Sequence, residues 1–208
     1  MKVLLLNGSS HLHGCTDTAL REIAAVLEAA GIEAEILFLG NEPVRDCTAC
    51  GACKTLSGRC VFDDDIVNQV IAKAEAADGF VFGSPVYYAH PSGRILSILD
   101  RVFYAGKHAF AHKPAAAIAS ARRAGTTATL DVLQKYFTIS QMPVVSSTYW
   151  TMVHGSKPED VLKDEEGLQT MRNLASNMAW MLRCIEAGKA AGIQPPQAES
   201  GARTNFIR

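Results

Sequence analysis

Cysteine is the residue type in this chain that most directly suggests chemistry. Four of the six cysteines lie in one short stretch: Cys47, Cys50, Cys53 and Cys60. The first three follow Cys-x2-Cys-x2-Cys, the spacing that wraps one [4Fe–4S] cluster, and the fourth could complete the ligand set. Zinc fits less well, because zinc ribbons usually have two Cys-x2-Cys pairs well apart. Thiols or disulfides in a pliable surface loop would give the same pattern, and Val61 stands where bacterial cluster motifs often have proline. The spacing therefore predicts a possible cluster site and leaves plain thiols open.

A loop rich in glycine and hydroxyl side chains follows the apolar run Val3 to Leu6 near the N-terminus. The run is typical of a strand buried on both faces. Helical spacing begins at Ala19, and Thr16 or Asp17 is the expected N-cap. Backbone N–H groups and the helix dipole favour an anion at such a junction. We therefore predict a phosphate site formed by Ser9, His11, Gly14, Cys15 and Thr16.

Three other interpretations of this loop are weaker. A P-loop needs a lysine, and Cys15 stands in its place, so a magnesium triphosphate would lose its main cation. Cys15 and Arg21 formally match a phosphatase loop, but Arg21 continues the helical pattern and is more simply a solvated residue. An ordinary strand-to-helix connection would not need so many glycines and hydroxyls together.

Composition sets the broad class of the protein. The chain has 208 residues, of which 48% are hydrophobic and 20% charged, and its net charge is −1. These values predict a single globular domain over residues 1–208 and give no electrostatic basis for a nucleic-acid partner. The N-terminal apolar run is too short for a signal peptide, and we expect no membrane association and a cytoplasmic location.

Predicted strands and helices alternate along the chain. The strands are expected at residues 3–6, 33–39, 80–82, 115–119 and 143–147, and the helices from 19 and over 65–77, 92–103, 126–138 and 165–188. A cysteine-bearing insertion covers 41–64, and an extended tail covers 192–208. This alternation predicts an α/β fold with a doubly wound parallel sheet of five strands in the order 2-1-3-4-5 and helices on both faces.

The switch point of that strand order lies between the first and third strands. The loops 8–16, 83–89 and 120–125 would line this crevice, and all three contain small, polar or aromatic residues. The topology and the residue types thus predict the same binding site.

The loops also resemble a known family. Asn7-Gly8-Ser9-Ser10 with Gly14-Cys15-Thr16, the run Gly83 to Tyr88 with the helix through Asp100-Arg101, and Ser120 to Thr126 resemble the loops of the NADPH-dependent FMN reductase and multimeric flavodoxin family, which has a flavodoxin-like fold. The cysteine stretch followed by Asp63-Asp64-Asp65 resembles the insertion of iron–sulfur flavoproteins, and the closing residues 204–208 are also similar. Ser10, His11 and Cys15 depart from the family's usual phosphate loop, and Arg122 and Arg123 stand where glycines are common.

The resemblance implies FMN as cofactor and NAD(P)H as co-substrate, with hydride passing to the flavin and then to a quinone, a flavin or another small acceptor in a ping-pong reaction. The alternative is an iron–sulfur flavoprotein that passes electrons between FMN and a [4Fe–4S] cluster. No catalytic acid–base residue is needed, because the flavin carries the chemistry. The second loop would contact the flavin ring through Pro85, Val86, Tyr87 and Tyr88. The third loop would contribute Ser120, Ala121, Arg122, Arg123 and Gly125.

Apolar residues outside the expected core point to self-association. Tyr149, Trp150 and the proline-rich tail are more apolar than a monomer needs, and the resemblance agrees, so we expect a homodimer or homotetramer. Tyr149, Trp150 and His154 are expected after the last strand and could face a flavin. Cys184 is expected on the packed side of the long helix.

Overall fold

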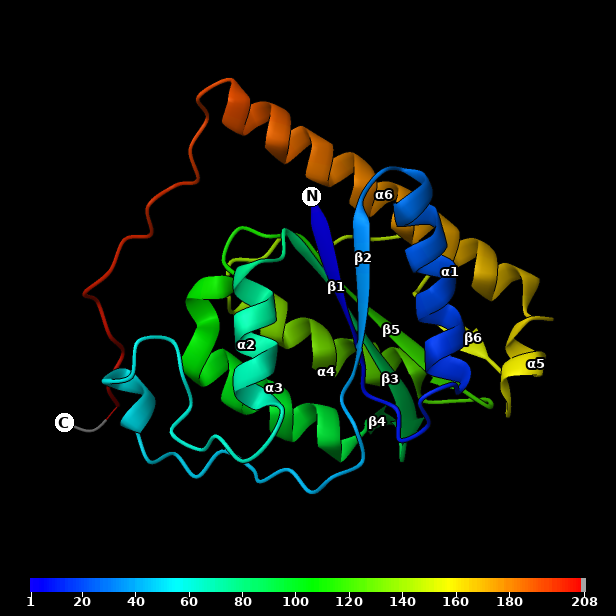
Figure 1. The fold of residues 1–208 in the computed structure, drawn as a ribbon, viewed down its shortest axis with the longest axis horizontal. Coiled ribbons are helices and arrows are strands. Elements are labelled where there is room, and N and C mark those ends of the chain that lie inside the picture. Colours follow the sequence, from blue (N-terminus) through cyan, green and yellow to red (C-terminus); the bar gives the residue numbers. More distant parts are fainter. Residues whose placement is uncertain (207–208) are drawn as a thin grey trace.

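A computed structural model describes residues 1–206 of the chain, and its centre is a parallel sheet (Figure 1). The strands lie in the order β2-β1-β3-β5-β6, and a short antiparallel strand, β4, pairs with β3. Counting only the parallel strands, this is the predicted order 2-1-3-4-5, so the predicted flavodoxin-like fold is confirmed. The bounds are β1 (Lys2–Asn7), β2 (Glu33–Phe38), β3 (Gly79–Tyr87), β4 (His90–Pro91), β5 (Ala115–Ala121) and β6 (Met152–His154).

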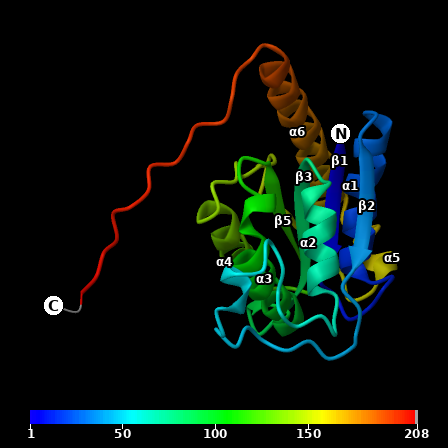
Figure 2. The same cartoon turned by 60° about the vertical axis from the view of Figure 1, so that its left-hand side comes forward.

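Helices cover both faces of the sheet (Figures 1 and 2). Core residues of α1 and α6 pack on one face, and core residues of α2, α3 and α4 pack on the other. The bounds are α1 (Cys15–Ala29), α2 (Val67–Glu75), α3 (Gly93–Gly106), α4 (Thr126–Thr138), α5 (Pro158–Val161) and α6 (Glu165–Ala190), with short 3-10 turns η1 (Ala52–Lys54) and η2 (Lys107–Ala109).

The apolar run of β1 is explained by burial on both faces. Leu4 and Leu6 belong to the core under α2, α3 and α4, whereas Val3 and Leu5 belong to the core under α1 and α6. Successive side chains of a strand point to opposite faces, so a central strand between two helical layers has no polar side.

Strand β3 is longer than predicted and turns back on itself. It runs through Tyr87, and Val86 and Tyr87 pair with Pro91 and His90 of β4. The two residues of the turn, Tyr88 and Ala89, have φ angles of 50° and 63°. Positive φ at both central residues is typical of a type I′ hairpin turn, which usually contains Asn or Gly, so Tyr88 and Ala89 do not indicate such a turn by their residue types.

The last parallel strand is divided in two, which corrects the predicted strand 143–147. Val144 forms only an isolated bridge with Ala115, and the regular strand β6 pairs Met152 with Ala119. Val144 and Met152 are therefore eight positions apart in the sequence, whereas their partners on β5, Ala115 and Ala119, are only four apart. The extra residues loop out of the sheet and carry Tyr149 and Trp150, which therefore precede β6 instead of following the last strand.

Helix α1 begins earlier than predicted, and the expected N-cap is wrong. Gly14 is the N-cap, and no side chain caps the helix. Thr16 and Asp17 lie buried in the first turn because each has another partner. The Thr16 hydroxyl lies 2.8 Å from the Ser120 hydroxyl, and the Asp17 carboxylate accepts a 2.7 Å hydrogen bond from Arg21 Nε.

The insertion 41–64 is mostly irregular and contains only η1 as regular structure. It lies against α3, where Arg94 donates to the carbonyl of Glu42 and Ser97 donates to Asp46. Beyond α6, residues 193–206 form no helix or strand and lead away from the sheet (Figure 2). Ile207 and Arg208, which belong to the C-terminal residues 204–208 that resemble the family, lie outside the described part of the chain. Among residues 1–206, no helix is long and apolar enough to cross a membrane.

Candidate functional site

The three predicted binding loops meet at the carboxyl edge of the sheet. Strand register brings them level: Asn7 pairs with Gly83, and Pro85 pairs with Ser120. At the edge of the sheet, Ala121 pairs with His154 of β6. The loops after β1, β3 and β5 therefore lie together at the edge where the strand order predicted the binding crevice.

Side-chain contacts connect these loops. The Thr16 and Ser120 hydroxyls join the first and third loops, and Ser10 Oγ lies 3.3 Å from the Tyr87 hydroxyl of the second. Gly125 closes the set, because a Cβ at this residue would lie 2.7 Å from the Ala89 Cα and its φ is +91°. Glycine is thus required where the third loop contacts the second.

The first loop has the features of an anion site. The Ser9 hydroxyl is buried and accepts a hydrogen bond from the His11 N–H at 3.0 Å, which folds the loop back on itself. Since Gly14 provides no side chain to cap α1, the first N–H groups of that helix remain available to a phosphate. The buried hydroxyls of Ser9, Thr16 and Ser120 are compatible with the same ligand. His11 lies exposed beside them.

Cys15 begins α1 as a protonated thiol. Its Sγ–H donates to the carbonyl of Gly155 at 3.6 Å, and burial raises the pKa of the thiol above its usual value. Because a phosphatase nucleophile must be a thiolate, this environment does not suit that chemistry. Arg21 lies exposed in an ion pair with Asp17 and does not complete a phosphate cradle.

The second loop presents an aromatic edge. Pro85 and Val86 are partly buried within β3, whereas Tyr87 is 42% exposed and Tyr88 is fully exposed at the tip of the hairpin. In the third loop, Ser120 and Ala121 are buried, and both Arg122 and Arg123 are exposed. The predicted contacts of all these residues with a flavin ring stay predictions.

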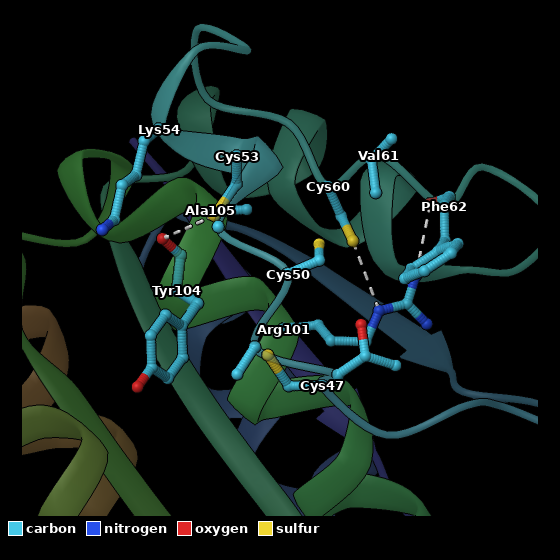
Figure 3. Close-up of a pocket in the computed structure, with 13 residues that line it drawn as sticks. Cys47, Cys50, Cys53, Lys54, Cys60, Val61, Phe62, Arg101, Tyr104 and Ala105 are labelled. Atoms are coloured by element: carbon cyan, nitrogen blue, oxygen red, sulfur yellow. Dashed lines mark hydrogen bonds between the residues drawn. The ribbon is translucent and has the colours of Figure 1, made fainter.

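The four clustered cysteines line a cavity of about 280 Å³ between the insertion and α3 (Figure 3). All four are free of disulfides, and Arg101, Tyr104 and Ala105 of α3 form part of the wall. Cys53 Sγ lies 3.8 Å from the Tyr104 carbonyl. Within residues 1–206, no three metal-binding side chains converge closely enough to hold an ion, so the sulfurs surround the cavity without closing on it. Cys184 lies apart and is exposed on α6, which corrects the expected packed position.

Two residues that hold Cys60, Asn68 and Arg101, were not predicted from the sequence. The Asn68 side chain of α2 accepts from the Cys60 N–H at 2.9 Å and donates to its carbonyl at 3.1 Å. Arg101 of α3, whose side chain is only 1% exposed, directs its Nε–H at the Cys60 sulfur at 3.4 Å. An arginine in a helix gives no sign of burial unless its partner is known, and its partner, Asp65, lies far away in the sequence.

The model of a protein family described as "NADPH-dependent FMN reductase" matches residues 1–157 of the chain. The chain belongs to this FMN reductase family. The protein is therefore a flavin-dependent oxidoreductase, and its fold and family support FMN as the flavin.

Two relatives of this FMN reductase family member are iron–sulfur flavoproteins. One, from Methanocaldococcus jannaschii, is 30% identical over 196 residues and matches 89% of this chain and 100% of its own length. Another, from Methanosarcina thermophila, is 27% identical over 195 residues, covering 91% of this chain and 99% of the relative.

A solved structure described as a flavodoxin from the domain Archaea has the same fold as this reductase family member. Its TM-score is 0.61 at 14% sequence identity, and the match covers 88% of this chain and 99% of the flavodoxin. At this identity the likeness supports the fold alone.

The hydroxyls of the first loop should contribute to FMN affinity. Replacing Ser9→Ala and Thr16→Val together removes two hydroxyls from the anion site, and a charge-assisted hydrogen bond contributes about 1.5–3 kcal/mol. We expect the dissociation constant for FMN to rise at least tenfold, measured by flavin fluorescence quenching.

The matched control is Ser9 intact with Thr16→Ser, which keeps a hydroxyl at the contact with Ser120 and should bind FMN within about threefold of the wild type. Equal affinity of the double variant and the wild type would place the phosphate elsewhere.

Proposed function

We propose that this protein is an iron–sulfur flavoprotein that passes electrons between FMN in the three-loop crevice and a [4Fe–4S] cluster in the cysteine cavity. The observation that carries the proposal is that four free cysteines line one cavity. The two curated relatives described above, both iron–sulfur flavoproteins matched over nearly their full lengths, support it.

The cavity fits a group larger than a single ion. Its volume of about 280 Å³ is several times the ~30 Å³ share of one water molecule. Gly51 and Gly58 have φ angles of 72° and 73°, so the backbone between the cysteines bends in ways that other residues rarely adopt. The donors are thiols, which suit iron–sulfur clusters, and a bound cluster would supply one-electron transfer.

The loops of the crevice would orient the flavin without acid–base chemistry. Bound FMN supplies hydride or single-electron transfer. Ser9, Thr16 and the first N–H groups of α1 would bind the phosphate, and the Pro85–Tyr88 edge would contact the ring. The exposed Arg122 and Arg123 would place positive charge near the ring's polar edge and so favour the reduced, anionic flavin.

Anaerobic purification tests the cluster. We expect about four iron and four acid-labile sulfide per chain by colorimetric assay, because four thiolates hold one [4Fe–4S] cluster. Cys50→Ser should lose the iron and keep FMN, since the two sites lie on different loops.

Cys184→Ser is the matched control, because this exposed cysteine lies outside the cavity, and it should retain both groups. Wild-type protein with FMN but without iron would contradict the cluster and leave an FMN reductase with free thiols.

NAD(P)H is the reductant that we propose for the flavin, with a quinone, a free flavin or another small molecule as acceptor. The family description supports a nicotinamide donor. The exposed Tyr87 and Tyr88 leave one edge of the crevice open to such substrates in turn, as a ping-pong reaction requires.

Anaerobic addition of NADPH or NADH should bleach the flavin absorbance band of the wild-type protein, and a quinone should restore it. Reduction by dithionite alone, with no response to either nicotinamide at millimolar concentration, would show that the electrons come from another donor.

Self-association is proposed from the looped-out segment before β6. Tyr149 and Trp150 are 55% and 58% exposed, and their rings form an edge-to-face pair with centroids 5.0 Å apart. An exposed aromatic pair on an insertion is typical of an interface, so we propose a homodimer or homotetramer.

Light scattering at micromolar concentration should therefore give a mass at least twice that of the 22.3 kDa chain. Trp150→Glu should shift the mass toward the monomer, because it would bury a charge at the interface, whereas Trp180→Glu on the exposed face of α6 should not. A monomeric wild type would contradict this proposal.

A further inference from the structure

Arg101 of α3 is a buried cation, with a side chain only 1% exposed. A buried guanidinium is rarely tolerated unless every donor has a partner. Here each of its three nitrogens donates. Nη1 pairs with Asp65 and donates to the Arg45 carbonyl at 3.3 Å, Nη2 donates to the Phe62 carbonyl at 3.2 Å, and Nε donates to Cys60 Sγ at 3.4 Å.

All of these partners belong to the segment that carries the cysteines or to its end. Arg45 lies just before Cys47, and Phe62 lies just after Cys60. One side chain of a packed helix therefore binds the backbone on both sides of the cysteine loop. Figure 3 shows its contacts with Cys60 and Phe62. Helix α3 itself is fixed by core residues such as Ile98 and Val102, so the point of attachment is rigid.

The charge balance of this contact is unusual. Asp65, with a side chain 6% exposed, neutralises Arg101 and also accepts the Val67 N–H at the start of α2, at 3.1 Å. Arginine is not deprotonated in proteins, so Arg101 is a permanent cation, and its Nε–H points at a cysteine sulfur.

We propose that Arg101 is the positioning residue of the cysteine site: it closes the loop around the cavity and, through its hydrogen bond to Cys60, raises the reduction potential of a cluster held there. The second half rests on the function proposed above. Reduction adds negative charge to a cluster, and hydrogen bonds to its sulfurs and nearby charge are known controls of the potential. A fixed cation with an N–H aimed at a ligand sulfur stabilises the reduced form more than the oxidised form.

The variant that tests the proposal is Arg101→Met combined with Asp65→Asn. Methionine fills the space without a donor, and asparagine keeps an acceptor for the Val67 N–H while it removes the charge that would otherwise be buried alone. FMN content reports folding, because the flavin loops do not contact Arg101. The midpoint potential of the cluster is measured by an anaerobic redox titration monitored by electron paramagnetic resonance. It should fall by at least about 59 mV, which is a tenfold change in the one-electron equilibrium constant.

The control is Arg59→Met. Arg59 precedes Cys60 directly but pairs with Asp63 at the surface, with its side chain 60% exposed, so its loss removes a neighbouring positive charge without removing the sulfur contact. We expect the one-electron equilibrium constant of this variant to stay within about threefold of the wild-type value. Equal shifts in both variants, or no shift in the double variant, would overturn the tuning role.

Two further measurements separate the outcomes. If the double variant loses FMN as well, Arg101→Lys serves in its place: it keeps a cation for Asp65 but cannot span both carbonyls and the sulfur, and it should lower the potential in the same direction. If wild-type protein contains no iron, the cluster proposal and the tuning role fail together.

The closing role is then still decided by trypsin. Lys54 lies exposed within the loop, and we expect cleavage after it, measured by mass spectrometry on metal-free protein, to be at least fivefold faster in the double variant. Equal cleavage rates would show that Arg101 does not hold the loop.

Discussion

The parallel pairing of β1 with β3 is the constraint on which the binding edge depends. Asn7 of β1 pairs with Gly83 of β3, and Ser120 of β5 lies level with Pro85, so three chain segments leave the sheet together. The Gly8 N–H then donates to the Gly83 carbonyl at 2.8 Å, which continues the pairing past the end of β1. A Cβ at Gly8 would lie 2.8 Å from the Ile95 side chain, so this close approach admits only glycine.

Helix α3 connects the two candidate sites. At its start, Ser92 donates to the Gly8 carbonyl at 2.8 Å and accepts from the Ile95 N–H, so it binds the loop after β1 and caps the helix. Nine residues later, Arg101 holds the cysteine loop, at roughly 14 Å along the helix axis given a rise of about 1.5 Å per residue. One helix, packed by its apolar face into the core, therefore fixes the spacing between the loop that would bind FMN phosphate and the loop that carries the cysteines.

Local sequence rules failed where tertiary contacts competed with them. Thr16 and Asp17 are good N-cap residues, yet both side chains have partners elsewhere, and Gly14 ends the loop instead. Tyr88 and Ala89 adopt left-handed conformations that their residue types disfavour, because the pairing of β3 with β4 and the contact with Gly125 over-determine the turn. The predicted strand 143–147 forms only an isolated bridge through Val144, and regular pairing with β5 begins at Met152, after the intervening residues have left the sheet.

The sequence by itself determined the order of the strands, the two-sided core and the three loops at one edge, because periodicity and length are local properties and the rules of parallel sheets are general. It also showed the cysteine spacing and the family resemblance. Only the tertiary structure decided that Cys60 is held by Asn68 and Arg101, that Arg101 is buried against Asp65, and that Cys184 faces outward. These facts depend on contacts between segments far apart in the chain, and the burial of a charged side chain follows from its partner and not from its own position in a helix.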